Sequence, residues 1–180
     1  PDAEATMTFK RPQEPSPPFP YESRDILVKH SEGHSLAGTL TIPEGEGPHP
    51  AAILISGSGL QDRNEELMGH KPFLVLADHL TRNGIAVLRA DDRGVGDSFV
   101  PERSTLEDDT SMDYASDISV LVEHLKQQPE VDVERIGLIG HSEGGLIGPI
   151  VADQRGDVAY LVLMAGPGRP AKRLSSSIYT

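Results

Sequence analysis

The sequence predicts an α/β fold: a mostly parallel sheet with helices on both faces and an antiparallel hairpin at its N-terminal side. Short segments rich in β-branched residues alternate with longer amphipathic segments, an order typical of parallel sheets. A G-x-S-x-G motif lies where one expected strand meets one expected helix. The 180 residues, 37% of them hydrophobic, suffice for one packed domain and make a second complete domain unexpected.

The N-terminal residues are rich in proline. Residues 11–20 (RPQEPSPPFP) contain five prolines, a composition that favours extended polyproline II over a packed element. We therefore expect residues 1–22 to form a leader outside the fold and the domain to span residues 23–180.

The domain is expected to begin with a hairpin and to continue with alternating strands and helices. Residues 25–30 and 35–42 are β-rich and flank residues 31–34 (SEGH), which suit a turn. The later strands are expected at residues 51–56, 85–90, 135–140 and 159–164, and the helices at residues 72–83, 112–127 and 144–154. This order predicts that the later strands are parallel.

The helix predictions rest on apolar spacing and on end signals. Apolar residues recur every three or four positions through the first two helices, so each helix can cover one face of the sheet. Gly84 follows the first helix, where a left-handed residue is expected. Ser111 or Asp113 is expected to cap the start of the second helix.

Composition excludes several classes of function. A net charge of −12 repels phosphate backbones and anionic lipids, so no nucleic-acid partner is expected. Without cysteine the chain has no disulfides, no thiolate metal site and no thiol nucleophile. The longest apolar runs are far shorter than the roughly 20 residues that cross a bilayer, so no membrane span is expected. Because the sequence begins with Pro1, any signal peptide would already be gone, which leaves the localisation open.

The segment Gly140-His141-Ser142-Glu143-Gly144-Gly145 has the pattern and the setting of a nucleophile elbow. In such an elbow the serine occupies a strained turn with its hydroxyl above the sheet, and small residues two before and two after it let strand and helix pass closely. Gly140 and Gly144 meet this need, and Ser142 is the expected nucleophile. The backbone N–H of Glu143, at a helix N-terminus, is expected to stabilise an oxyanion.

A second oxyanion donor is expected in the loop after the first parallel strand, Ser56-Gly57-Ser58-Gly59-Leu60-Gln61-Asp62-Arg63. Two glycines let the backbone approach a substrate there. We assign the second donor to the N–H of Ser58, with Gly59 as the alternative. A dinucleotide loop is the competing interpretation, but position 62 is Asp rather than the third glycine of G-x-G-x-x-G, and no phosphate-loop lysine follows. No cofactor is expected.

The loop after the second parallel strand reads Asp91-Asp92-Arg93-Gly94-Val95-Gly96-Asp97-Ser98. Its glycines permit a tight reversal, and Arg93 is expected to join neighbouring loops through ion pairs. A metal site built from Asp91, Asp92 and Asp97 is the alternative. Neither EF-hand spacing nor an H-E-x-x-H motif accompanies these residues, so no metal is expected.

The oxyanion loop, D-R-G-x-G-x-S and G-H-S-E-G-G follow successive strands in this order, and together they resemble the α/β-hydrolase superfamily over residues 25–168. The segment I-S-G-S-G-L-Q-D-R-N-E, followed by G-H-K-P-F, is similar to bacterial serine esterases related to dienelactone hydrolases and serine aminopeptidases. This resemblance implies a Ser-Asp-His triad whose acid and histidine follow later strands. It also favours an exported protein, periplasmic or extracellular.

The resemblance implies that the triad is incomplete within these residues. The acid and histidine loops of the family have no counterpart here, so we expect this chain alone to be nearly inactive. His141 is expected to pack beside the elbow, and His70 is the alternative base within the chain. A sheet that stops after residues 159–164 has an unpaired edge, which a missing C-terminal half or a partner chain is expected to cover.

The leading hypothesis is a truncated α/β-hydrolase that acts on small-molecule carboxylic esters. Ser142 attacks, the amides of Glu143 and Ser58 hold the oxyanion, and a histidine outside this chain removes the proton. Two alternatives remain open: an aminopeptidase or other amide hydrolase of the same fold, and a catalytically silent hydrolase-like binding module.

Overall fold

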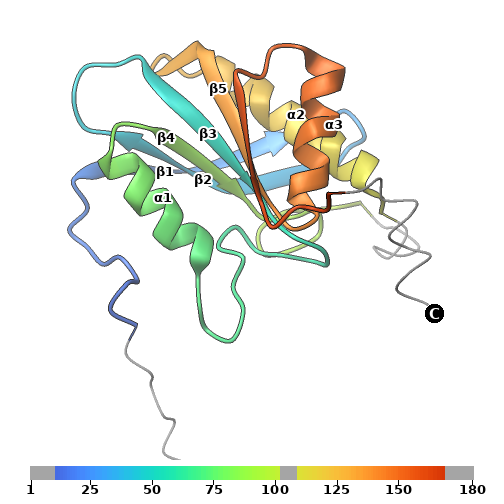
Figure 1. Ribbon diagram of the computed structural model, residues 1–180, viewed down its shortest axis with the longest axis horizontal. Coiled ribbons are helices and arrows are strands. Elements are labelled where there is room, and N and C mark those ends of the chain that lie inside the picture. The colour runs from blue at the N-terminus through green and yellow to red at the C-terminus, as the bar shows by residue number, and fades with distance from the viewer. Residues whose placement is uncertain (1–10, 102–108, 169–180) are drawn as a thin grey trace, which may run out of the picture.

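The computed structural model describes residues 11–101 and 109–168 (Figure 1). Within them a six-stranded sheet has the order β1-β2-β4-β3-β5-β6. The strands are β1 (Tyr21–Lys29), β2 (Ser35–Pro43), β3 (His49–Ile55), β4 (Ala86–Ala90), β5 (Val131–His141) and β6 (Tyr160–Met164). The helices are α1 (Pro72–Arg82), α2 (Ser111–Lys126) and α3 (Gly144–Arg155). Each predicted strand and helix is therefore found, with ends that differ by a few residues.

β1 and β2 form the predicted antiparallel hairpin, paired along their whole length. Across the turn the backbone N–H of His30 donates to the carbonyl of His34 (2.9 Å), and Gly33 adopts a φ of 94° that favours glycine. Because β1 begins at Tyr21, the folded part starts two residues before the expected boundary at residue 23. Residues 11–20 form neither helix nor strand.

The central sheet is parallel, as predicted. β2 pairs antiparallel with β4, whereas β4, β3, β5 and β6 run parallel to one another. The carboxyl ends of parallel strands meet at one edge of a sheet, which is where α/β proteins bind their ligands. The loops after β3, β4 and β5 therefore lie together, and they carry the candidate site residues.

Helices cover both faces of the sheet, as predicted (Figure 1). α1 packs Phe73 and Ala77 into a core that includes Ala52 and Val87 of the sheet. α2 and α3 lie on the opposite face and bury a larger set of side chains there, including Leu121 and Val151. Two separate apolar clusters thus hold the layers together.

The helix ends follow the expected chemistry with one correction. Gly84 is left-handed, with a φ of 85°, as predicted. The cap of α2 is Thr110 rather than Ser111 or Asp113: its hydroxyl accepts from the N–H of Asp113, whose carboxylate accepts from the N–H of Thr110 (2.8 Å). The reason is that an extended residue must precede the helix, and Thr110 has that conformation while Asp113 completes the reciprocal capping box.

The last strand of the described sheet is exposed. Leu161, Val162 and Leu163 of β6 are 38%, 43% and 51% exposed, and within the described residues β6 pairs with β5 alone. Monomeric proteins seldom expose an apolar edge strand of this kind on their surface. In the described part of the chain, no helix combines the length and apolarity needed to cross a membrane.

Candidate active site

Ser142 lies in a tight turn between β5, which ends at His141, and α3, which begins at Gly144. Its φ is 50°, in the left-handed region that residues with a Cβ seldom adopt. Its backbone N–H donates to the carbonyl of Met164 at the end of β6 (2.9 Å). A strained strand–turn–helix of this form is the backbone that a nucleophile elbow requires. The nucleophilic role of Ser142 stays a prediction.

Gly140 and Gly144 lie where strand and helix approach most closely. A Cβ placed on Gly140 would overlap the carbonyl of Gly144. A Cβ on Gly144 would overlap the carbonyl of Ile55 and lie 2.7 Å from the carbonyl oxygen of Ser56. Larger residues fit neither position unless the backbone moves. These are the two positions at which the sequence pattern required small residues.

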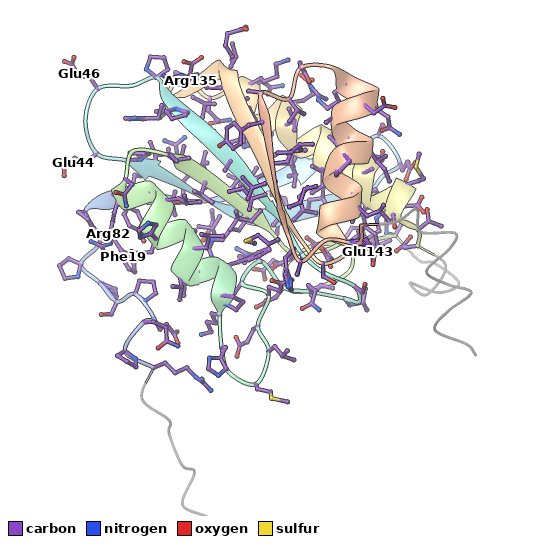
Figure 2. All side chains as sticks on the ribbon, viewed as in Figure 1. Phe19, Glu44, Glu46, Arg82, Arg135 and Glu143 are labelled. Atoms are coloured by element: carbon purple, nitrogen blue, oxygen red, sulfur yellow. The ribbon has the colours of Figure 1, made fainter. Side chains whose placement is uncertain are left out.

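Amide groups without acceptors occur in the elbow and in the loop after β3. Glu143 lies at the N-terminal end of α3 (Figure 2), and its N–H has no acceptor among the described residues. The same holds for the N–H groups of Ser58 and Gly59. The carboxylate of Glu143 accepts from the hydroxyl of Ser111 on α2 (2.7 Å). The backbone of Glu143 thus suits an oxyanion, whereas its side chain is engaged elsewhere.

The partly buried carboxyl group of Asp92 holds the loop after β3 in place. Asp92 accepts from the hydroxyl of Ser56 (3.1 Å) and from the N–H of Gln61 (2.9 Å), at opposite ends of the loop. Burial raises the pKa of Asp92 to about 7, although these two hydrogen bonds oppose the rise. A cavity of about 30 Å³ between this loop and α2 has room for only one or two waters.

The acidic residues of the loop after β4 do not form a metal site. Asp91 accepts from the side chain and the backbone N–H of Arg63 (2.5–3.0 Å), and Asp97 accepts from the same guanidinium (2.9 Å). Burial would raise the pKa of Asp91, but the hydrogen bonds from Arg63 hold it below its usual range. Arg63 thus occupies the place that a cation would need.

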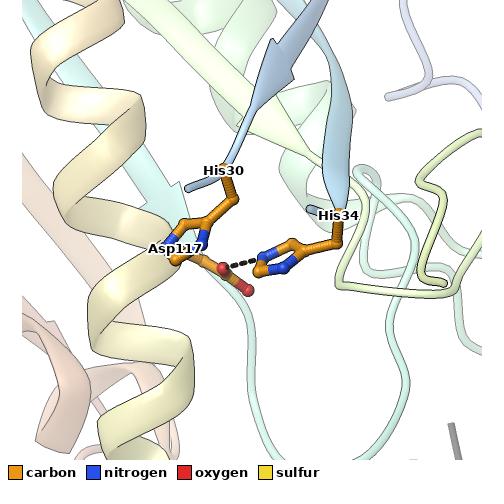
Figure 3. Close-up of side chains that lie close together, drawn as sticks. All are labelled: His30, His34 and Asp117. Carbon is orange, nitrogen blue, oxygen red and sulfur yellow. Dashed lines mark hydrogen bonds and ion pairs between the residues drawn. The ribbon is translucent and has the colours of Figure 1, made fainter. Parts of the chain in front are cut away.

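Arg93 joins neighbouring elements through ion pairs, as predicted. Its guanidinium donates to both carboxylate oxygens of Asp117 on α2 (2.7 and 2.8 Å). Asp117 also accepts from Nε2 of His34 (2.7 Å), and His30 lies beside His34 (Figure 3). All four residues are buried. The network fastens the β1–β2 turn and the loop after β4 to α2.

His30, His34 and Asp117 are the one group of described residues close enough to hold a metal ion, but their arrangement does not suit one. The two imidazole rings are stacked, with centroids 4.2 Å apart and planes within 16°. Nitrogen lone pairs lie in the ring plane, so stacked rings cannot both point at one ion. Arg93 already neutralises Asp117. We assign this cluster a structural role.

We expect the cluster of His30, His34 and Asp117 to make the folded protein less stable at acidic pH. Burial lowers the pKa of His30 most, and the neighbouring His34 lowers it further. Asp117 and Glu32 oppose this lowering, and Arg93 adds the smallest effect in the same direction as burial. The unfolded chain therefore takes up the proton first, so this contribution to stability is present above the ordinary histidine pKa of about 6.5 and is lost as the pH falls below it.

Urea unfolding of the full-length protein at pH 7.5 and 5.5 measures this effect. We expect His30→Gln to lose less stability between the two pH values than the wild type loses. His79→Gln, which changes an exposed histidine of α1, is the matched control and should keep the wild-type difference. An equal pH dependence in all three proteins would contradict the assignment.

The remaining candidate histidines are placed differently. His70 contacts the guanidinium of Arg11 and borders a surface groove beside α1, and no contact joins it to Ser142 among the described residues. His141 donates from Nδ1 to the carboxylate of Glu65 (2.7 Å), so it lies beside the elbow as predicted. Sequence reasoning did not identify Glu65. The only sign of its role was that the segment I-S-G-S-G-L-Q-D-R-N-E ends in this acidic residue.

Comparisons with known proteins identify the family and several relatives of this chain. Residues 70–178 match the family described as serine aminopeptidase, S33. Esterase EstD of Thermotoga maritima is 33% identical over 157 residues, which are 87% of this chain and 35% of that protein. The 2,6-dihydropseudooxynicotine hydrolase of Paenarthrobacter nicotinovorans is 29% identical over 126 residues, or 70% of this chain and 30% of that protein.

Solved structures share the fold. A hypothetical protein of Pseudomonas aeruginosa, PA2218, gives a TM-score of 0.69 at 20% identity. The match covers 96% of this chain and 56% of the PA2218 chain. Acetyl xylan esterase 1 of Thermoanaerobacterium sp. gives 0.68 at 22% identity, with 88% and 52% covered. This chain thus spans about a third of its curated relatives and about half of these structures. By its sheet order, its strand–turn–helix at Ser142 and the match over residues 70–178, the chain belongs to the serine aminopeptidase (S33) family of the α/β-hydrolase superfamily.

Proposed function

We propose that this chain is the nucleophile-bearing part of a serine hydrolase that cleaves carboxylic esters. The observation that carries the proposal is the left-handed Ser142 between β5 and α3, with the acceptor-free N–H of Glu143 beside it. A partly exposed serine in a strained turn at a helix N-terminus is suited to attack a carbonyl carbon. Similarity to Esterase EstD supports the choice of an ester substrate.

In the proposed reaction the Oγ of Ser142 forms a bond to the acyl carbon, and its proton passes to a histidine outside the described residues. The carbonyl oxygen takes up negative charge and is held by the N–H groups of Glu143 and of Ser58 or Gly59. The ester C–O bond then breaks, and the alcohol leaves with the proton. Water, deprotonated by the same histidine, releases the carboxylic acid and restores Ser142.

Amide hydrolysis is the second candidate, because the matched family is described as serine aminopeptidase. Both reactions use the same elbow, and they differ in protonation of the leaving group and in pocket shape. A panel of short-chain aryl esters and aminoacyl anilides, assayed with the full-length protein, separates them. We expect a higher kcat/KM for the esters. A preference for the anilides would favour the aminopeptidase.

A catalytically silent binding module of the same fold is the third possibility. It is motivated by the described residues themselves, since no hydrogen bond joins any of their histidines to Ser142, and His141 is hydrogen-bonded to Glu65 instead. A silent module would bind ester analogues without covalent reaction. A fluorophosphonate that labels Ser142 excludes this alternative.

We further propose that protein outside these residues supplies the base and covers the exposed side of β6. The expected result is that residues 1–180 alone hydrolyse esters at least about 10⁴-fold more slowly than the full-length protein, because removal of a triad member costs about that much. Parallel assays of the two proteins with one aryl ester measure the difference.

His70→Ala in the full-length protein is the control and should leave turnover unchanged. If residues 1–180 turn over at a rate typical of enzymes, about 1–10³ s⁻¹, a base lies within them. His70→Ala in that shorter protein then tests whether His70 is the base.

A further inference from the structure

We propose that Glu65 is a positioning residue that sets the oxyanion loop against the nucleophile elbow, an inference that rests on the proposed serine mechanism. A single carboxylate oxygen, Oε1, accepts from the backbone N–H of Gly57 (2.8 Å) and from Nδ1 of His141 (2.7 Å). Gly57 belongs to the loop after β3, and His141 directly precedes Ser142. One oxygen atom therefore joins the two segments that carry the oxyanion donors.

The position of Glu65 is itself fixed. It is buried, with a side chain only 10% exposed, and its φ is 51°. Its N–H donates to the carbonyl of Asp62 (2.9 Å), and the carboxylate of Asp62 accepts from the N–H groups of Asn64 and Glu66 (3.1 and 2.8 Å). A left-handed residue with a Cβ persists only where its surroundings hold it. This turn therefore fixes the carboxylate of Glu65 in its position between Gly57 and His141.

The loop and the elbow are in direct contact at Gly57. A Cβ on Gly57 would lie 3.2 Å from Cβ of Ser142 and 3.3 Å from Oε1 of Glu65. The hydrogen bond to Glu65 also engages the N–H of Gly57, so the unpaired amides nearby are those of Ser58 and Gly59. Glu65 thus helps to decide which amides face an oxyanion.

Glu65 and Asp92 hold the loop in different ways. Asp92 ties Ser56 and Gln61 to the loop after β4. The bond from His141 to Glu65 is the only hydrogen bond between residues 56–66 and residues 141–143 in the described part of the chain. Without Glu65 the loop would remain attached through Asp92, but its distance from Ser142 would no longer be set. The effect should therefore appear in catalysis more than in folding.

The test compares variants of the full-length protein by ester turnover, normalised by active-site titration. Because a displacement of about 1 Å costs about 10²-fold in rate, we expect Glu65→Ala to lower kcat by about 10- to 100-fold and to change KM by less than about 3-fold. Affinity for an arylboronic acid, which forms a tetrahedral adduct with the serine, should fall in the same proportion as kcat/KM. Glu65→Gln keeps an oxygen acceptor and should lose less than about 10-fold.

Glu66→Ala is the matched control, because it removes the same charge from the neighbouring exposed residue. It should keep the wild-type kcat and boronate affinity. His141→Ala breaks only the bond to the elbow and should share the loss seen in Glu65→Ala. Should Glu65→Ala fail to fold, Glu65→Gln and His141→Ala decide the question.

Wild-type kcat and boronate affinity in Glu65→Ala, or in both other variants, would overturn the role of Glu65. So would an equal loss in Glu66→Ala. Mass-spectrometric mapping of a fluorophosphonate label in the wild type distinguishes failure of the proposed function from failure of the positioning role alone. A label absent from Ser142 would overturn the proposed function as well, whereas a label at Ser142 beside unchanged Glu65 variants would overturn the positioning role alone.

Discussion

Replacing Ser142 with alanine in the full-length protein is expected to abolish ester turnover, with kcat lower by about 10⁶-fold. The variant keeps the turn, the amides and the fold but lacks the oxygen that forms the acyl-enzyme. Residual activity over water would come from the oxyanion donors alone. Initial rates with an aryl ester measure the loss, and a fluorophosphonate probe should label the wild type and leave the variant unlabelled.

Ser119→Ala is the matched control for this experiment. Ser119 lies on α2, and its hydroxyl donates to the carbonyl of Ala115 in the same helix (2.9 Å). Its loss should leave kcat and labelling at the wild-type level. Turnover or labelling that survives in Ser142→Ala would show that another residue is the nucleophile, and the interpretation of the elbow would be wrong.

The fold was predictable because its signals are local. Alternation of strand and helix, the turn at residues 31–34 and the left-handed Gly84 each depend on a few neighbouring residues, and the structure confirms all three. The cap of α2 was misplaced because Thr110, Ser111 and Asp113 all suit a helix start, and only the backbone conformation selects Thr110.

The candidate site was predictable only where it follows a contiguous motif. The turn at Ser142 could be placed because a G-x-S-x-G pattern between strand and helix implies its geometry. Glu65 could not be paired with His141, 76 positions away, since no spacing rule links two loops across a sheet. For the same reason the cluster of His34 and Asp117 could not be predicted until the structure placed the β1–β2 turn against α2.

Gly144→Val is expected to destabilise the full-length protein by about 3 kcal/mol or more, and to lower its folded yield and activity together. A Cβ at Gly144 would overlap the carbonyl of Ile55, a backbone atom of the central strand β3 that cannot move without disturbing its pairing with β5. A β-branched side chain adds two methyl groups at the same point. Urea unfolding and the soluble yield measure the effect.

Gly148→Ala, one turn further along α3, is the matched control for Gly144→Val. A Cβ on Gly148 would make only ordinary van der Waals contacts, the nearest at 3.7 Å from Leu161. We therefore expect no clash in this variant. Alanine is also favoured over glycine within a helix by up to about 1 kcal/mol, so this variant should be as stable as the wild type or more stable. Equal stability of Gly144→Val and Gly148→Ala would mean that strand and helix do not pass as closely as described, and the strained turn at Ser142 would lose its support.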